Sequence, residues 1–242
     1  MQDFNLLPQE KSFRQLLLPF MAPYFLYVLL ASMPSEYISA ESIQVVTLIF
    51  VSLVMVVFRK NYRFGRFKII YAGVAVLTTP IAVILWIFPL YLIGNAEVMV
   101  DPGAALLIGS PVYFYVKIIN TTILVALFEE LLMRVFLMEL FHQAGQQIKK
   151  EGVVDSILNT FDQKPLQLLS KPLSLFSLAM TTLFFTGGHT MPEYLSALLY
   201  FSFTNLLYKI FGSVWVCVIV HGAVNFVIAI LVKYYAMEFL WF

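Results

Sequence analysis

The sequence predicts an all-α fold, a bundle of transmembrane helices with about seven spans. Of its 242 residues, 61% are hydrophobic and only 12% are charged, whereas an ordinary soluble domain is about 45–50% apolar and about 25% charged. The apolar residues also gather in runs that reach the ~20 residues needed to cross a bilayer as a helix. This composition excludes a soluble globular enzyme, a disordered chain and a nucleic-acid-binding arm.

Seven apolar runs supply the predicted spans. They cover residues 13–33, 42–58, 69–93, 113–141, 173–191, 194–211 and 213–235. The fourth run is longer than a perpendicular span, so we expect it to tilt, to project from the bilayer or to begin later than residue 113. Four prolines lie inside the first and third runs: Pro19, Pro23, Pro80 and Pro89. Proline is tolerable there where neighbouring helices cover the carbonyls that it leaves without an amide donor.

The connection over residues 142–172 is long for a helix hairpin. Five apolar residues within it recur at helical spacing, with acidic and amide residues between them: Val153, Val154, Ile157, Leu158 and Phe161. This pattern is typical of an amphipathic helix that lies on the membrane surface, and a partly ordered linker is the alternative. Residues 1–242 are therefore interpreted as one integral membrane domain, with 142–172 as its cytoplasmic loop.

Lysine and arginine divide unequally between the two sides of the predicted bundle. One side carries twelve: Lys11, Arg14, Arg59, Lys60, Arg63, Arg66, Lys68, Lys149, Lys150, Lys164, Lys171 and Lys209. The other side carries only Lys233, together with six acids: Glu36, Glu41, Glu97, Asp101, Glu193 and Glu238. Because basic loops stay in the cytoplasm, the sequence predicts a multi-pass protein of the cell membrane with its N-terminus cytoplasmic and its C-terminus outside.

Ionisable residues also lie inside three of the apolar runs. They are Glu129, Glu130 and Arg134 in the fourth run, His189 in the fifth, and His221, followed by Asn225, in the seventh. Each ionisable group at the bilayer centre costs about 2.5–3.5 kcal/mol, so such groups face the bundle interior and find partners. Lys117 also lies in the fourth run, and the pattern gives it no role.

Residue spacing predicts which of these groups meet. Residues four apart share a helix face, so we expect Glu130 to pair with Arg134. Glu129 lies about 100° around the helix and points elsewhere. The same spacing places two further pairs on shared faces: Phe185 with His189, and His221 with Asn225. Since the three runs reach these residues at different depths, one shared site requires either helix edges that differ by several residues or tilted helices.

A carboxylate, two imidazoles and an amide in a cavity of low dielectric constant suit hydrolysis by general-base catalysis. Glu129 would take a proton from a water molecule that His189 also holds. His221 and Asn225 would donate hydrogen bonds to the oxyanion that forms on a peptide carbonyl. Two alternatives stay open: Glu129, His189 and His221 as zinc ligands of an intramembrane protease, or the same polar residues serving a non-catalytic scaffold or transporter.

The three groups together resemble one family, the CAAX protease and bacteriocin-processing (CPBP, or Abi) intramembrane proteases. The family pattern is EExxxR, then FxxxH, then HxxxN on three membrane helices. Here it is matched by Glu129-Glu130-x-x-x-Arg134, Phe185-x-x-x-His189 and His221-x-x-x-Asn225. The resemblance covers about residues 120–232, and Gly212-Ser213-Val214-Trp215 also resembles the family's approach to its last motif.

The resemblance implies a glutamate-dependent endopeptidase that needs no cofactor. It makes Glu129 the base, His189 its partner, and His221 and Asn225 the oxyanion hole; the supporting residues are Glu130, Arg134 and Phe185. Two departures leave the substrate preference open: Val135 replaces a common glycine, and residues 142–172 lengthen the interval between motifs. The expected partners are membrane lipid and a peptide or protein substrate at the membrane, and no nucleic acid.

Overall fold

A computed structural model describes residues 8, 10–34, 37–92, 108–165, 174–235 and 237–241. These residues form helices joined by turns and contain no strand, which confirms the predicted all-α bundle. The long helices outside the centre are α1 (Phe13–Ala31), α2 (Ala40–Phe58), α3 (Ile70–Leu92), α10 (Leu175–Gly187), α11 (Tyr194–Phe211) and α12 (Val214–Tyr235).

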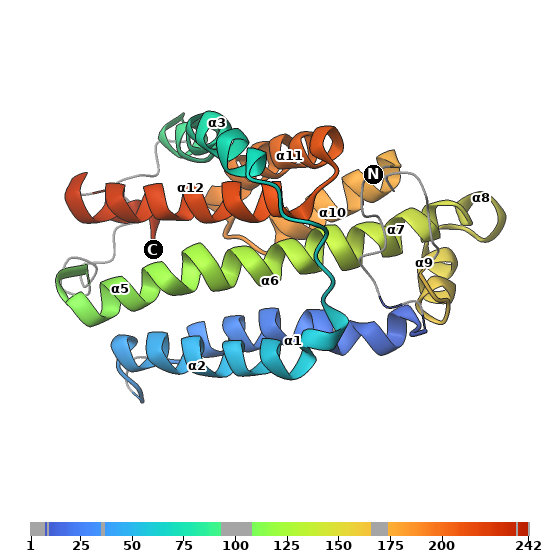
Figure 1. Cartoon of the computed structure of the whole chain (residues 1–242), viewed down its shortest axis with the longest axis horizontal. Coiled ribbons are helices and arrows are strands. Elements are labelled where there is room, and N and C mark those ends of the chain that lie inside the picture. Colours follow the sequence, from blue (N-terminus) through green and yellow to red (C-terminus); the bar gives the residue numbers. More distant parts are fainter. Residues whose placement is uncertain are drawn as a thin grey trace.

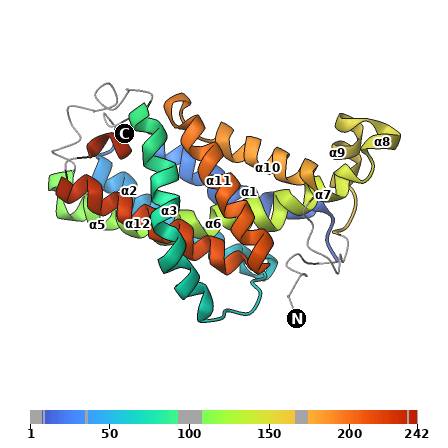
Figure 2. The same ribbon diagram turned by 90° about the horizontal axis from the view of Figure 1, so that it is seen from above.

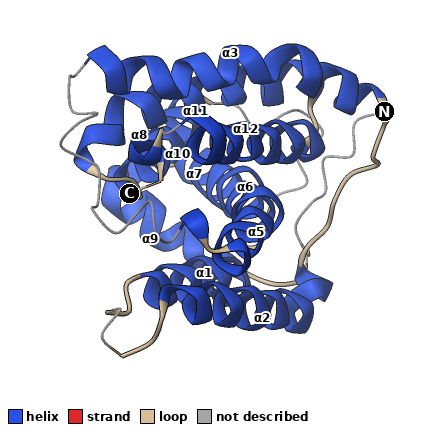
Figure 3. Cartoon of the chain, turned by 90° about the vertical axis from the view of Figure 1, so that its left-hand side faces the viewer, coloured by secondary structure: helices blue, strands red, loops and turns tan. Residues whose placement is uncertain are grey.

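One continuous helical run forms the centre of the bundle. It consists of α5 (Pro111–Ile119), the π-helical segment η2 (Asn120–Val125), α6 (Ala126–Glu130), a second π-helical segment η3 (Leu131–Leu137) and α7 (Met138–Gly145). Helices α1 and α2 pack on one side of it and α10 and α12 on the other, and α3 and α11 pack on α12 in this second layer (Figure 1 and Figure 3). The central run therefore presents its residues to both layers.

The number of spans differs from the prediction of seven. Among the described residues, four helices are long and apolar enough to cross a membrane: Phe13–Ala31, Ala40–Asn61, Ile70–Leu92 and Val214–Tyr235. Helix α10 has only 13 residues, or about 20 Å, which is less than the ~30 Å of a bilayer core. The central run is long enough but carries the ionisable residues of the first motif.

The helix ends follow from local sequence. Ser12 caps α1 by accepting a hydrogen bond from the Gln15 amide, and the Gln15 side chain bonds back to the Ser12 amide, which satisfies two amide donors. Ser110 caps the central run with Pro111 next to it, where a proline costs no hydrogen bond. Gly212 ends α11 in the left-handed conformation, at φ +60°, which glycine adopts without a steric penalty.

One of the two prolines of α1, Pro23, is accommodated as expected. Pro23 has no amide hydrogen, so it cannot donate to the carbonyl of Pro19 one turn earlier. The Tyr62 hydroxyl donates to that carbonyl at 2.6 Å. Tyr62 follows α2, so a residue from another segment supplies the missing donor and joins α1 to the loop before α3.

The connection after α7 contains two helices, α8 (Ile148–Glu151) and α9 (Val153–Phe161). They extend beyond one end of the bundle, whereas α3 crosses α11 and α12 (Figure 2). Ser156 and Thr160 are buried, while Val153, Val154 and Leu158 are exposed. The predicted helix is thus present, with Ile157 and Phe161 packed against the core of the protein and its other three apolar residues exposed. Its contact with lipid stays a prediction.

Some residues used for the orientation lie outside the described part of the chain. These are Glu36, Glu97, Asp101 and Lys171. Residues 166–172 of the predicted cytoplasmic loop also lie outside it, as do residues 93 and 173 at the edges of two predicted spans.

Candidate active site

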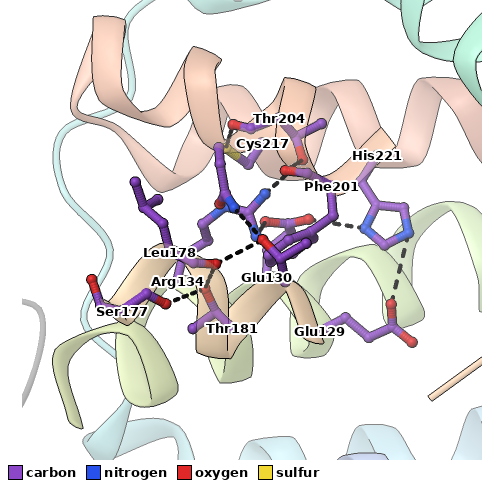
Figure 4. A network of polar contacts seen from close by, with 12 residues as sticks. Glu129, Glu130, Arg134, Ser177, Leu178, Thr181, Phe201, Thr204, Cys217 and His221 are labelled. Carbon is purple, nitrogen blue, oxygen red and sulfur yellow. Dashed lines mark hydrogen bonds and ion pairs between the residues drawn. The ribbon is translucent and has the colours of Figure 1, made fainter. Parts of the chain in front are cut away.

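The central helical run brings two adjacent glutamates to one histidine. Glu129 and Glu130 end α6, between the two π-helical segments. His221 lies on α12, and Figure 4 shows its ring between the two carboxylates. His221 Nδ1 is 3.1 Å from Glu130 Oε1, and His221 Nε2 is 3.9 Å from Glu129 Oε2. Residue spacing predicts that the two glutamates point differently, but it does not predict that one imidazole contacts both.

The Glu130 side of this cluster is fully enclosed. Glu130 pairs with Arg134 at 3.4 Å, as its i,i+4 spacing predicts, and their side chains are 1% and 0% exposed. Arg134 donates a hydrogen bond of 2.6 Å to the Thr204 hydroxyl, and its guanidinium lies 4.0 Å from the centre of the Phe201 ring. A buried ion pair is stable only when further contacts of this kind replace the lost water. α11 supplies them here.

The Glu129 side faces a cavity of about 660 Å³. The four residues predicted to be catalytic all line it, together with the supporting Phe185: Glu129, His189, His221 and Asn225. The structure therefore brings the three motifs, which are far apart in the sequence, to the wall of one cavity. Their residues lie at different positions along their helices. Exposed residues at its edge include Met33, Gly188 and Thr190.

His189 follows the end of α10 rather than lying within a helix. α10 ends at Gly187, and a hydrogen-bonded turn carries the chain to Met191–Glu193 and α11. His189 Nδ1 lies 2.8 Å from the Phe185 carbonyl. A carbonyl oxygen only accepts, so Nδ1 carries the proton, and in the neutral ring Nε2 keeps its lone pair. The Phe185 and Trp86 rings pack against this imidazole, with centroids at 4.6 and 5.3 Å.

The glycine next to His221 allows α12 to approach the central run closely. A Cβ atom on Gly222 would meet the Thr122 carbonyl oxygen at 2.5 Å. One turn further on, Asn225 donates a hydrogen bond of 2.8 Å to the Thr121 carbonyl. Small residues permit such close packing of membrane helices. A Cβ atom on Gly188 would meet the Tyr24 hydroxyl at 2.7 Å, whereas Gly187 has open space around it.

Several residues of the site could not be identified from the sequence. Tyr200 is buried, lines the cavity, and its ring centroid lies 5.8 Å from that of His221. Its hydroxyl has no hydrogen-bond partner among the described residues. Lys117 and Trp86 line the same cavity. Aromatic residues are so frequent in this chain that nothing in the sequence distinguishes these from residues of the apolar core.

The described residues contain no group of three histidine, cysteine, aspartate or glutamate side chains arranged to hold a metal ion. Glu129 Oε2 lies 3.9 Å from His221 Nε2, and Glu130 engages only the Nδ1 atom of that ring. Because Glu129, His189 and His221 do not form such a group here, a zinc ligand set would need these side chains to rearrange.

These features define a class: polytopic helical membrane proteins with ionisable residues gathered around a cavity inside the bundle. Residues 111–227 match the family model described as Rce1-like, "Type II CAAX prenyl endopeptidase Rce1-like". This match covers the three motifs and supports the CPBP family of CAAX proteases that they predict. At the level of class, the family description indicates a CAAX-type intramembrane endopeptidase. Comparisons with curated proteins and with solved structures found no match.

Proposed function

We propose that this protein hydrolyses a peptide bond of a membrane-associated peptide or protein with a water molecule activated by Glu129 and His189. The observation that carries the proposal is that both side chains line the same cavity. The Glu129 side chain is 14% exposed, against 1% for Glu130. Only a carboxylate that reaches the cavity can accept a proton from water held there.

The proposed water has two acceptors. One hydrogen bonds to the Glu129 carboxylate and the other to Nε2 of His189, whose Nδ1 proton is held by the Phe185 carbonyl. A lone pair of the water then points to the substrate carbonyl. Glu129 takes one proton as the oxygen attacks the carbonyl carbon. The C–N bond of the tetrahedral intermediate breaks as Glu129 returns that proton to the leaving nitrogen.

The developing negative charge on the carbonyl oxygen needs donors that face the cavity. Asn225 and His221 are the proposed donors, in agreement with the roles that the family motif implies. Because His221 Nδ1 donates to Glu130, its Nε2 can donate to an oxyanion only when the ring carries both protons. Removing one such donor typically costs 100- to 1,000-fold in kcat.

The family description supports a prenylated peptide as the first substrate to test. The probe is an internally quenched peptide in which a farnesylated cysteine precedes aliphatic residues, offered to the purified protein in lipid nanodiscs. Wild-type protein should cleave it, and Glu129→Ala and His189→Ala should lose nearly all activity. Full activity in either variant would overturn the proposal.

A chelation experiment separates the water-activating mechanism from the zinc alternative. Activity should survive a strong chelator, and elemental analysis should find no stoichiometric zinc. Activity that is lost on chelation and restored by Zn²⁺ would instead assign Glu129, His189 and His221 to a metal. A scaffold would cleave no probe and would respond to Glu129→Gln only in its stability.

The proposed orientation has the N-terminus in the cytoplasm and the C-terminus outside. Cys217 is buried, so a cysteine introduced at exposed Glu10 or Tyr235 is the accessible thiol in a labelling experiment on intact cells. An impermeant maleimide should label the Tyr235→Cys variant and not the Glu10→Cys variant. The reverse pattern would contradict the orientation.

A further inference from the structure

The cavity has a second polar end that the three motifs do not explain. Lys117 is the one lysine or arginine among the described residues that line it. We infer that Lys117 forms a subsite for a carboxylate, the C-terminal carboxylate of the peptide that leaves after cleavage. The inference rests on the proposed function and identifies which end of the substrate occupies this part of the cavity.

A row of residues on the central helical run connects this subsite with the glutamate. Tyr113, Lys117, Thr121, Val125 and Glu129 follow each other at intervals of four, and all line the cavity. In an α-helix, four residues turn about 400°, so the three steps from Lys117 to Glu129 would drift about 120° out of line. The π-helical segment Asn120–Val125 lies within the row. Its wider turns rotate less per residue, which compensates for the drift and keeps the row on one wall.

Neighbouring groups fix the Lys117 ammonium at the cavity wall. Nζ donates to the Tyr113 hydroxyl at 3.0 Å and to the Trp241 carbonyl at 3.4 Å. It also lies 4.5 Å from the centre of the Trp241 ring. The carbonyl contact is the longer of the two, so an incoming carboxylate would take the place of Trp241 and form a stronger, charge-assisted bond.

The charges in the cavity favour one direction of binding. Among the described residues that line it, the acidic ones are Glu129 and Glu193, and Lys117 is the one lysine or arginine. A peptide whose carboxylate lies at Lys117 has its negative end against the positive charge and its scissile bond at Glu129. The opposite direction would bring the carboxylate to the glutamate.

The length of the row predicts the length of the leaving peptide. Twelve residues separate Lys117 from Glu129, which is about 18 Å along a helix at about 1.5 Å per residue. An extended peptide covers about 3.3 Å per residue. About five residues therefore fit between the cleaved bond and the carboxylate.

The test compares quenched, farnesylated peptides with a free C-terminal carboxylate and with a C-terminal amide, cleaved in neutral phosphatidylcholine nanodiscs. Wild-type protein should show a KM that is about tenfold or more higher for the amide, the loss expected for one hydrogen bond to a charged group. Lys117→Met should raise KM for the acid by a similar factor and abolish the difference between acid and amide. Lys117→Arg should retain part of that difference.

Lys233 provides the matched control. It is a second lysine near Phe114, it donates to the Ile108 carbonyl, and it is not among the residues that line the cavity. Lys233→Met should keep the wild-type ratio of acid to amide. A series of peptides with one to seven residues after the cleaved bond should give the lowest KM near five, and only for free carboxylates.

The outcomes separate the inference from the proposed function. A wild-type protein that cleaves acid and amide with equal KM overturns the carboxylate subsite and leaves the protease intact, and this result needs no variant to fold. A wild-type protein that cleaves neither peptide overturns the proposed function. If phosphatidylglycerol, an anionic lipid, changes KM whereas amidation does not, the anion at Lys117 is a lipid headgroup and the inference is wrong.

Discussion

Glu129 and Glu130 are consecutive, chemically identical residues that lie in two different regions of the molecule. Glu130 belongs to a closed cluster with Arg134, Thr204 and Phe201. Glu129 lies on the wall of the cavity and has one described ion pair, 3.9 Å from His221. The ring of His221 lies between the two regions.

The difference teaches that surroundings, rather than residue type, decide which carboxylate can do chemistry. In the closed cluster a carboxylate is held in position by a cation and has no room for a substrate. On the cavity wall the same group can exchange a proton with water. The four predictions below test this division, beginning with the largest expected effect.

Neutralising Glu129 should affect catalysis far more than folding. In Glu129→Gln, we expect kcat to fall about 100- to 10,000-fold, the range for loss of a general base. The midpoint of thermal unfolding should stay the same or rise, because a partly buried charge is removed. Both quantities are measured on one preparation. A large fall in thermal stability would place Glu129 in the structural cluster instead.

Removing Arg134 should affect folding stability far more than catalysis. Arg134→Met leaves Glu130 buried without its cation, which typically costs about 3–5 kcal/mol. Unfolding in a denaturing detergent should show this loss. The double variant Arg134→Met with Glu130→Gln should recover much of it, because no uncompensated charge remains. If the two single effects simply add in the double variant, the pair is not coupled.

Gly222 links the two regions through the distance between α12 and the central run. Gly222→Ala would push a Cβ atom against the Thr122 carbonyl oxygen, and overpacking of this kind costs about 1–3 kcal/mol. Activity should fall as well, because Asn225 would be displaced from its hydrogen bond to the Thr121 carbonyl. Gly73→Ala is the control, since its Cβ would meet nothing within 4 Å, and it should leave both readouts unchanged.

The smallest effect is expected for a change at Tyr62, which lies remote from both glutamates. Tyr62→Phe removes the donor to the Pro19 carbonyl and should cost about 0.5–1.5 kcal/mol of stability. The KM and kcat for the quenched peptide should stay at wild-type values. A selective loss of activity would mean that α1 is coupled to the cavity.

The sequence predicts much of this molecule because its charges are scarce. Five of the seven predicted helices begin and end within two residues of their apolar runs: 13–33, 42–58, 69–93, 194–211 and 213–235. Capping residues such as Ser12 and Gly212 flank these runs. The pair Glu130 and Arg134 follows from spacing alone. The count of seven spans is not confirmed: four described helices are long and apolar enough to cross a membrane, and α10, which ends at Gly187, is too short.

Other features depend on contacts between residues far apart in the chain. Tyr62 reaches Pro19 across 43 positions, and no local pattern signals it. Ser156 and Thr160 are the fully buried residues of α9, which packs against α7. Tyr200 joins the site through its position on α11 alone. None of these contacts leaves a periodicity that the sequence could show.

The π-helical segment Asn120–Val125 has a consequence for how this protein tolerates change. Substitutions within it alter a side chain, but deletion of one residue would rotate everything before it by about 100° relative to Glu129. Lys117 would leave the cavity wall although hydropathy and every motif stayed intact. We therefore expect the protein to tolerate substitutions in this segment but not insertions or deletions. The length of the segment, rather than its amino-acid composition, is the property that must be kept.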